Sequence, residues 1–489
     1  MTLPIELACV QERVRKIAAD YGLDYFQTIF EMVGWDDMNE VASYGGFPRR
    51  YPHWRFGMTF DQLSKGHAYG LQKIYELVIN NDPCYAYLLR GNTFMDQKLV
   101  MAHVYAHCDF FKNNLWFAPT NRHMVDELAS HATRVQRHVD KESFQEVETF
   151  LDACLTLENL IDIYAPYAPR RNGNGAADDQ KRKVIRFEAK HYMDPFINPR
   201  EFIEEQRRQI EEERRRAPRF PERPERDVLL FLVDHAPLKE WQRDILAMIR
   251  DEAYYFAPQG LTKIMNEGWA SYWHSKMMTQ DLLEPDEIVD YANRHSQTMG
   301  VQPGRVNPYK LGIELFRDIE ERWDTGRFGK EYEECDDLEV KRDWDTGLRQ
   351  GREHIFEVRR IYNDVTFIDE FLTPSFCERQ KLFTYDFNQK TGRMEVSGRD
   401  FDEIKDRLLR SLANAGNPVI EVKDANFGNR GELMLGHRYD GEDLHRGYAA
   451  ETLPQLYKIW TRPVHLQTMV EGRPHRLTYD GEKVTTEEQ

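Results

Sequence analysis

The chain has few cysteines and no pairing motif among them. Six cysteines are spread through 489 residues, and no two form a Cys-x-x-Cys pair. Small secreted folds that depend on disulfides carry cysteines at much higher density. The cysteine pattern therefore argues against a disulfide scaffold and favours a protein of the reducing cytoplasm.

Long apolar runs and an excess of positive charge are missing as well. No stretch approaches the roughly 18–20 apolar residues of a membrane span, and the N-terminus lacks a basic-then-apolar signal pattern. Lys and Arg total 66 against 83 Asp and Glu, a formal net charge of −17. The charge run at 200–216 mixes glutamates with its arginines, as a solvated helix does. We expect a cytoplasmic protein with no membrane span and no nucleic-acid partner.

Sequence motifs for nucleotide binding and serine hydrolysis are also absent. The glycine cluster at 426–431 lacks Walker spacing and a following Lys-Ser/Thr pair. No Gly-x-Ser-x-Gly or Gly-x-Gly-x-x-Gly connects a strand to a helix. Clusters of histidine and carboxylate are left as the candidates for chemistry.

What is present is helical periodicity over most of the chain. Apolar residues recur at three and four positions as far as residue 365, interrupted by a flexible charged insertion at about 166–226. Beyond it, a hairpin at 381–396 and two strand–helix–strand arrangements indicate a different fold. The prediction is a mainly α protein, with a large helical domain at 1–365 and a small α+β domain at 366–489.

Four local expectations accompany this division. We expect a helix over 5–35, an aromatic and arginine-rich loop over 34–57, a buried strand at 227–233 and a frayed tail at 484–489.

Two imidazoles one helical turn apart give the strongest chemical signal. His103 and His107 share one face of a predicted helix at 95–113, where together they can hold one metal ion. Another apolar helix, at 258–278, carries Glu267 and His274 on a single face. A buried carboxylate needs a proton, a cation or a metal. We expect a divalent metal, zinc first, on His103, His107 and Glu267; histidines satisfied within the core are the alternative.

The helix predicted at 122–138 also places histidine and carboxylate side chains on one face. His123, Glu127 and His131 lie on one stripe, four residues apart. Glu127 is the first candidate for a general base, ahead of Glu252 and Glu40, and His131 or His274 would polarise an oxyanion. Surface histidines at a helix N-terminus are the alternative.

A loop near the N-terminus offers candidates for substrate binding. Arginine forks recognise carboxylates and other anions, so this loop would contact an anionic or peptide-like substrate unless its charges only anchor it. The residues are Glu40, Arg49, Arg50 and His53.

The segments 35–57, 102–114, 266–277 and 385–461 together resemble the stage V sporulation protein R (SpoVR) family, in the form found also in non-sporulating proteobacteria. The likeness covers nearly the whole chain. It implies a link to the spore cortex, a peptidoglycan layer, or to stationary phase and stress. It also implies gene neighbours that include a PrkA-type serine kinase and a partner protein. This association does not define a biochemical activity.

A more distant likeness concerns the proposed metal ligands. Residues 266–272, Asn-Glu-Gly-Trp-Ala-Ser-Tyr, are similar to the Asn-Glu-Gly-Phe-Ala segment of gluzincin aminopeptidases, whose glutamate is the third zinc ligand. That likeness assigns the ligands to Glu267, His103 and His107 and implies a zincin-like helical domain. The gluzincin His-Glu-x-x-His is His-Val-Tyr-Ala-His here, without the catalytic glutamate, and Glu267 follows at an unusually long separation.

Three functions are compatible with these residues. The first is a metal-dependent amide or peptide hydrolase acting on a peptide, a peptidoglycan fragment or a stress-related substrate. The second is a non-catalytic regulator that binds proteins of a PrkA-type kinase system or a wall-synthesis complex. The third is a di-metal redox protein that uses the pair Glu127 and His131 beside the pair His103 and His107, with Glu267.

Overall fold

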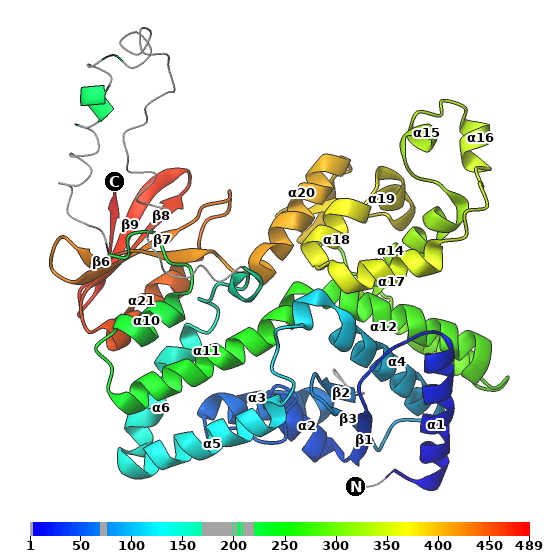
Figure 1. The fold of residues 1–489 in the computed structure, drawn as a ribbon, viewed down its shortest axis with the longest axis horizontal. Coiled ribbons are helices and arrows are strands. Elements are labelled where there is room, and N and C mark those ends of the chain that lie inside the picture. The colour runs from blue at the N-terminus through cyan, green and yellow to red at the C-terminus, as the bar shows by residue number, and fades with distance from the viewer. Residues whose placement is uncertain (1–2, 69–75, 169–198, 200–202, 207, 209–219) are drawn as a thin grey trace. The chain divides into compact units, whose positions relative to one another are not determined.

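The fold is that of a computed structural model, which describes residues 3–68, 76–168, 199, 203–206, 208 and 220–489 (Figure 1). The chain divides into two compact units. The first contains Met1–Leu151 and Asp251–Asn417, and the second contains Asp152–Arg250 and Pro418–Gln489. Each unit therefore joins two stretches that are far apart in the sequence.

The first unit is a body of helices. They are α1 (Ile5–Asp20), α2 (Trp35–Ser43), α3 (Trp54–Ala68), α4 (Phe94–Asn113), η1 (Leu115–Phe117), α5 (Met124–Lys141), α12 (Lys263–Met277), η3 (Met278–Leu282), α13 (Ile288–Thr298), α14 (Pro308–Thr325), α15 (Lys330–Glu333), α16 (Leu338–Arg342), α17 (Gly351–Ile361), α18 (Asp364–Phe371), α19 (Pro374–Gln380), α20 (Phe401–Leu412) and η4 (Ala413–Gly416). Two further helices, α6 (Phe144–Thr156) and α11 (Glu240–Leu261), belong partly to each unit.

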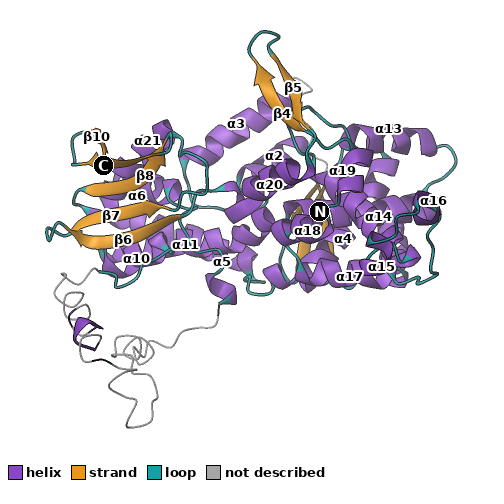
Figure 2. Ribbon diagram, turned by 90° about the horizontal axis from the view of Figure 1, so that it is seen from above, coloured by secondary structure: helices purple, strands orange, loops and turns teal. Residues whose placement is uncertain are grey.

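Two small sheets accompany these helices. In the first, β3 (Cys84–Leu89) is central, parallel to β1 (Thr28–Val33) and antiparallel to β2 (Glu76–Ile79). The second is the antiparallel hairpin of β4 (Thr384–Asn388) and β5 (Arg393–Gly398), which stands out from the helices of its unit in Figure 2. The hairpin predicted at 381–396 is confirmed.

The central pair of helices, α4 and α12, lie side by side (Figure 1). The helix α4 begins at a capping box, in which the Thr93 side chain accepts from the Asp96 N–H. It is buried from Val100 to Phe111. Within this core, the Trp269 indole N–H of α12 donates to the Asp109 carboxylate of α4 at 2.8 Å. Such a buried polar contact fixes the register of the two helices as well as their separation.

Two further contacts hold α12 in place. At its first turn, the Asp364 carboxylate accepts from the N–H groups of Ile264 and Met265 at 2.8 and 2.9 Å. Along its length it crosses α14 so closely that a Cβ on Gly268 would lie 2.4 Å from the Gly312 Cα. Because Glu267 is next to Gly268, these contacts also set the position of its carboxylate.

The second unit contains a five-stranded sheet of order β10-β9-β8-β7-β6. Its strands β7 and β8 are parallel and are joined by α21, whereas the other neighbours are antiparallel. The bounds are β6 (Ile420–Phe427), β7 (Glu432–His437), α21 (Arg446–Trp460), β8 (Val464–Val470), β9 (Arg473–Tyr479) and β10 (Val484–Glu488). The same unit contains η2 (Ala165–Tyr167) and α10 (Val228–His235). A mainly α protein with a C-terminal α+β part is therefore the observed fold class.

Four local expectations need correction. The helix expected over 5–35 ends at Asp20, and its last part is strand β1. The loop expected over 34–57 starts with α2 and ends within α3, with irregular backbone only between them. The strand expected at 227–233 is α10, because a short apolar run fits either element and Asp227 caps a helix by accepting from the Leu230 N–H. The tail at 484–489 is ordered by pairing with β9.

Most of the insertion expected at about 166–226 lies outside the described residues. Among the helices that the structure describes, none combines the length and the apolar character needed to cross a membrane.

Candidate metal centre

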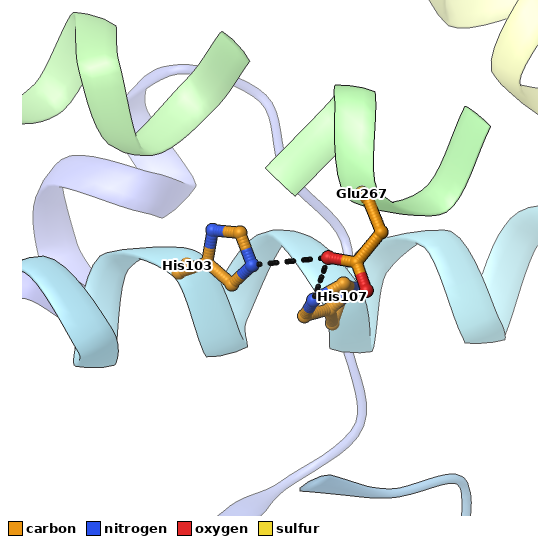
Figure 3. A group of neighbouring side chains, drawn as sticks. All are labelled: His103, His107 and Glu267. Atoms are coloured by element: carbon orange, nitrogen blue, oxygen red, sulfur yellow. Dashed lines mark ion pairs between the residues drawn. The ribbon is translucent and has the colours of Figure 1, made fainter. Parts of the chain in front are cut away.

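The helices α4 and α12 bring two imidazoles and a carboxylate together (Figure 3). The Oε2 atom of Glu267 is 3.5 Å from Nε2 of His103 and 3.5 Å from Nε2 of His107. Within the described residues, these three form the one group of His, Cys, Asp or Glu whose ligand atoms all lie within 4.8 Å of one another. The sequence pattern had selected the same three residues.

The Nδ1 atoms of both histidines have polar partners within hydrogen-bond distance. The Nδ1 atom of His107 is 2.8 Å from the Asn266 side-chain oxygen, an acceptor, so His107 donates its Nδ1 proton there. The Nδ1 atom of His103 is 2.8 Å from Nδ1 of His274. If His103 donates in that pair as well, both rings present an Nε2 lone pair to Glu267. Hydrogen bonds of this kind set the tautomer and the orientation of metal-binding histidines.

Three acceptor atoms that converge in this way repel one another unless a cation lies between them. Ligands at 2.0–2.2 Å on a tetrahedral zinc ion are separated by about 3.4 Å, close to the two distances of 3.5 Å. The Glu267 Oε2 atom is buried and has no hydrogen-bond partner among the described residues. The donor set therefore fits a divalent metal of the zinc type.

The electrostatics of the group favour the forms that bind metal. Burial, helped by the neighbouring His107, lowers the pKa of His103. Burial raises the pKa of Glu267, but when the Nε2 atoms of His103 and His107 carry protons, their hydrogen bonds to the carboxylate outweigh burial and hold that pKa well below its ordinary value. Burial, with His103 nearby, also lowers the pKa of His274 far below its usual range. Neutral imidazole and ionised carboxylate are the states that metal ligands need.

The site is largely enclosed, and Glu267 is its most exposed member. The side chains of His103 and His107 are 5% and 7% exposed, whereas that of Glu267 is 19% exposed. A metal held by these three residues would keep a fourth position for water, as catalytic zinc sites do, whereas structural sites are closed by four protein ligands.

Glu127 and His131 belong to a different group, which we call the Glu252 cluster (Arg50, Glu127, His131 and Glu252). The His131 Nδ1 atom is 2.9 Å from Glu252 Oε1, and its Nε2 atom is 3.3 Å from Glu127 Oε1. Arg50 Nη2 is 2.5 Å from Glu252 Oε2, with both side chains nearly buried. Among the described residues, the side-chain polar contacts of Glu127, His131 and Glu252 are with one another and with Arg50.

The other residues of the N-terminal loop occupy varied positions. His53 is 8% exposed, and its Nδ1 atom accepts from the Arg55 backbone N–H at 3.2 Å. Glu40 and Arg49 are exposed. Arg50, one of the two arginines expected to contact a substrate, is thus paired with Glu252.

Two further residues lie beside the metal group. One is Asn266, the partner of His107, which stands next to Glu267 in the motif. The other is Tyr309, at the start of α14, whose ring stacks 6.3 Å from that of His103. Sequence reasoning gave Asn266 no role of its own, although its place in the motif could have suggested one.

Comparison with known proteins identifies the family of the chain. The family described as SpoVR like protein matches residues 3–417, and the SpoVR-like C-terminal domain matches residues 418–471. An Escherichia coli (strain K12) protein with the name Uncharacterized protein YcgB is 30% identical over 480 residues, which cover 93% of this chain and 90% of the relative. No solved structure matches the chain. The two family matches adjoin and together cover nearly all of the sequence, so the chain belongs to the SpoVR family.

Proposed function

We propose that this protein is a zinc-dependent hydrolase of amide or peptide bonds, with His103, His107 and Glu267 as the metal ligands. The observation that carries the proposal is the convergence of two Nε2 atoms and one carboxylate oxygen at 3.5 Å, with the Nδ1 atoms held by Asn266 and His274. Zinc on such a set supplies a Lewis acid for a carbonyl oxygen and a water with a pKa near 7.

The remaining residues have supporting roles in this proposal. Asn266 and His274 keep the two imidazoles oriented toward Glu267. Because a water of such low pKa ionises near neutral pH, the reaction does not require the glutamate that gluzincins place after the first histidine. The contacts of Glu127 and His131 favour a structural role in the Glu252 cluster over the base and oxyanion roles first expected of them.

The substrate class follows from the family alone. The link of SpoVR proteins to the spore cortex suggests an amide of a peptidoglycan fragment or a related wall peptide. In a stress setting, another peptide of similar chemistry would replace it.

A second candidate function is a non-catalytic regulator of a PrkA-type kinase system, with the metal in a structural role. The observation in its favour is the missing base: position 104 is valine, where gluzincins place the catalytic glutamate. The third possibility, a di-metal redox centre, loses support because Glu127 and His131 contact Glu252 and not the metal group.

Metal analysis of the purified protein separates these functions. We expect about one zinc per chain for the wild type, and loss of most of it in His103→Ala. The matched control is His123→Ala, a histidine of the same unit that is exposed. Unchanged zinc in His103→Ala would refute the ligand set, and two irons per chain would favour the redox centre. If zinc is bound but peptidoglycan fragments and peptide amides are not cleaved, the regulator is favoured.

A further inference from the structure

A cavity in the first unit lies apart from the metal ligands and has no role in the proposed function. Its volume is about 530 Å³, within the 300–1,000 Å³ typical of small-molecule sites. It is lined by the loop before α14, the first turns of α14, the end of α19, the hairpin β4–β5 and one face of α20. Figure 2 shows this hairpin standing above the helices that it joins.

The floor of the cavity is apolar. Its deepest side chains belong to the core of the unit: Leu311 and Ile404 are each 4% exposed, and Phe376 is fully buried. Leu382, Met394 and Leu408 extend this surface toward the opening. The Met394 side chain also closes one wall, since a Cβ on Gly304 would lie 2.8 Å from its Cε atom. Gly304 has φ +75°, which a side chain would resist in any case.

The opening of the cavity is positively charged. Arg305, Lys310 and Lys381 line it, and none has a side-chain ion partner among the described residues. A fourth cation, Arg407, makes only an exposed contact with Asp386 at 3.3 Å. On a chain with a formal net charge of −17, such a group of cations around an apolar hollow is unusual.

The one carboxylate in the lining does not cancel these charges. Glu314 is bound by Arg317 at 2.9 Å and by Gln380 at 3.0 Å. The backbone of Lys381 is strained, because this residue ends α19 with φ +53°, a conformation that favours glycine. A lysine at that position supplies charge to the opening at the expense of backbone strain.

We propose that this cavity binds a small amphipathic anion. Its apolar chain lies on Leu311, Phe376 and Ile404, and its carboxylate or phosphate head is held at the opening by Lys310, Lys381 and Arg305. The apolar floor supplies affinity, and the cations select an anionic head over a neutral one. This site is independent of the metal centre and of the hydrolase proposal.

Calorimetric titration of the full-length protein tests the proposal with three ligands of equal chain length. They are dodecanoate, dodecyl phosphate and dodecanol, each below its aggregation limit. We expect both anions to bind, and the alcohol to bind at least about tenfold more weakly. The tighter anion identifies the head group as a carboxylate or a phosphate.

Two variants locate the site. Lys381→Gly removes a charge and relieves the positive φ, so it should fold at least as well as the wild type while losing about tenfold in affinity for dodecanoate. Leu408→Trp fills the apolar floor and should abolish binding. The control is Lys330→Gln, a charge removal at an exposed residue away from the cavity.

The outcome can refute the proposal in three ways. Absence of anion binding, equal affinity for the alcohol, or unchanged affinity in Leu408→Trp would each overturn it. Zinc content should be the same in all variants, which keeps this test separate from that of the metal centre.

Discussion

At the scale of single residues, the geometry of the metal group depends on the hydrogen-bond partners of its two histidines. A lone histidine in a core is ordinarily satisfied by a neighbour, whereas here each imidazole has one nitrogen bound and one directed at Glu267. That His103 and His107 would lie together was predictable from their spacing, because side chains four apart on a helix share a face. The hydrogen bond from His107 to Asn266 was not predicted, because spacing carries no information about what lies behind a side chain.

The partner of His107 gives the first prediction at this scale. Asn266→Leu removes the acceptor that fixes the His107 tautomer, so zinc affinity should fall by about tenfold to a hundredfold. Asn266→Asp keeps an acceptor oxygen and should retain most of the affinity. Competition with a fluorescent zinc chelator measures both. Equal affinities in the two variants would show that the hydrogen bond does not orient the ring.

The Glu252 cluster leads to a prediction about stability, in which zinc binding is unchanged. Glu252→Ala leaves the buried Arg50 guanidinium without its carboxylate and deprives His131 of its Nδ1 partner. Loss of one member of a buried ion pair costs about 3–5 kcal/mol of unfolding free energy. Urea unfolding should show a loss of this order, while zinc content per folded chain stays unchanged. A variant of normal stability that loses zinc would place Glu252 in the metal centre instead.

At the scale of elements, α12 is the helix on which the site depends, and its N-terminus contains an unusual cap. Asp364 is buried and accepts from two backbone N–H groups of α12. Burial raises its pKa from 3.8 to about 7, although those two hydrogen bonds lower it. The helix that positions Glu267 therefore begins on a carboxyl group that titrates near neutral pH.

This cap predicts a pH dependence with a definite sign. Between about pH 4 and pH 7 the folded state holds the Asp364 proton and the unfolded chain does not, so unfolding free energy falls as pH rises. Asp364→Asn keeps an acceptor oxygen and has no proton to lose. Relative to the wild type, this variant should gain more than about 1 kcal/mol in stability from pH 4.5 to pH 7.5. Parallel pH profiles of the two proteins would refute the assignment.

Whether an element is specified by local sequence explains which elements could be predicted. Long amphipathic helices and the hairpin around residues 388–392 were predictable, because their signals are local. The strands β1 and β10 were missed because each depends on a partner strand that local periodicity does not reveal. The segment Val228–His235 was misread because eight residues of mostly apolar sequence do not distinguish a strand from a helix.

At the scale of the whole molecule, the composition of the units follows from contacts that join distant segments. The sheet β6–β10 belongs with 152–250, and residues 366–417 belong with the helical body. Such long-range assembly cannot be read from a change in local pattern, which marks where strands begin and not what they pack against. The first strands after residue 365 are β4 and β5, which begin at Thr384 after the helices α18 and α19.

The last prediction concerns the helices that follow residue 365. Phe367, Phe371, Phe376 and Ile404 are all nearly or fully buried in the same core cluster as α4 and α12. Burial of four such side chains contributes about 6–12 kcal/mol, comparable with the whole stability of a domain. A fragment that ends at residue 365 should therefore fail to give a cooperative unfolding transition or to bind zinc. A longer fragment that ends at residue 417 contains every residue of the first unit and should retain zinc. Zinc binding by the shorter fragment would show that α18–α20 are dispensable for holding α4 against α12.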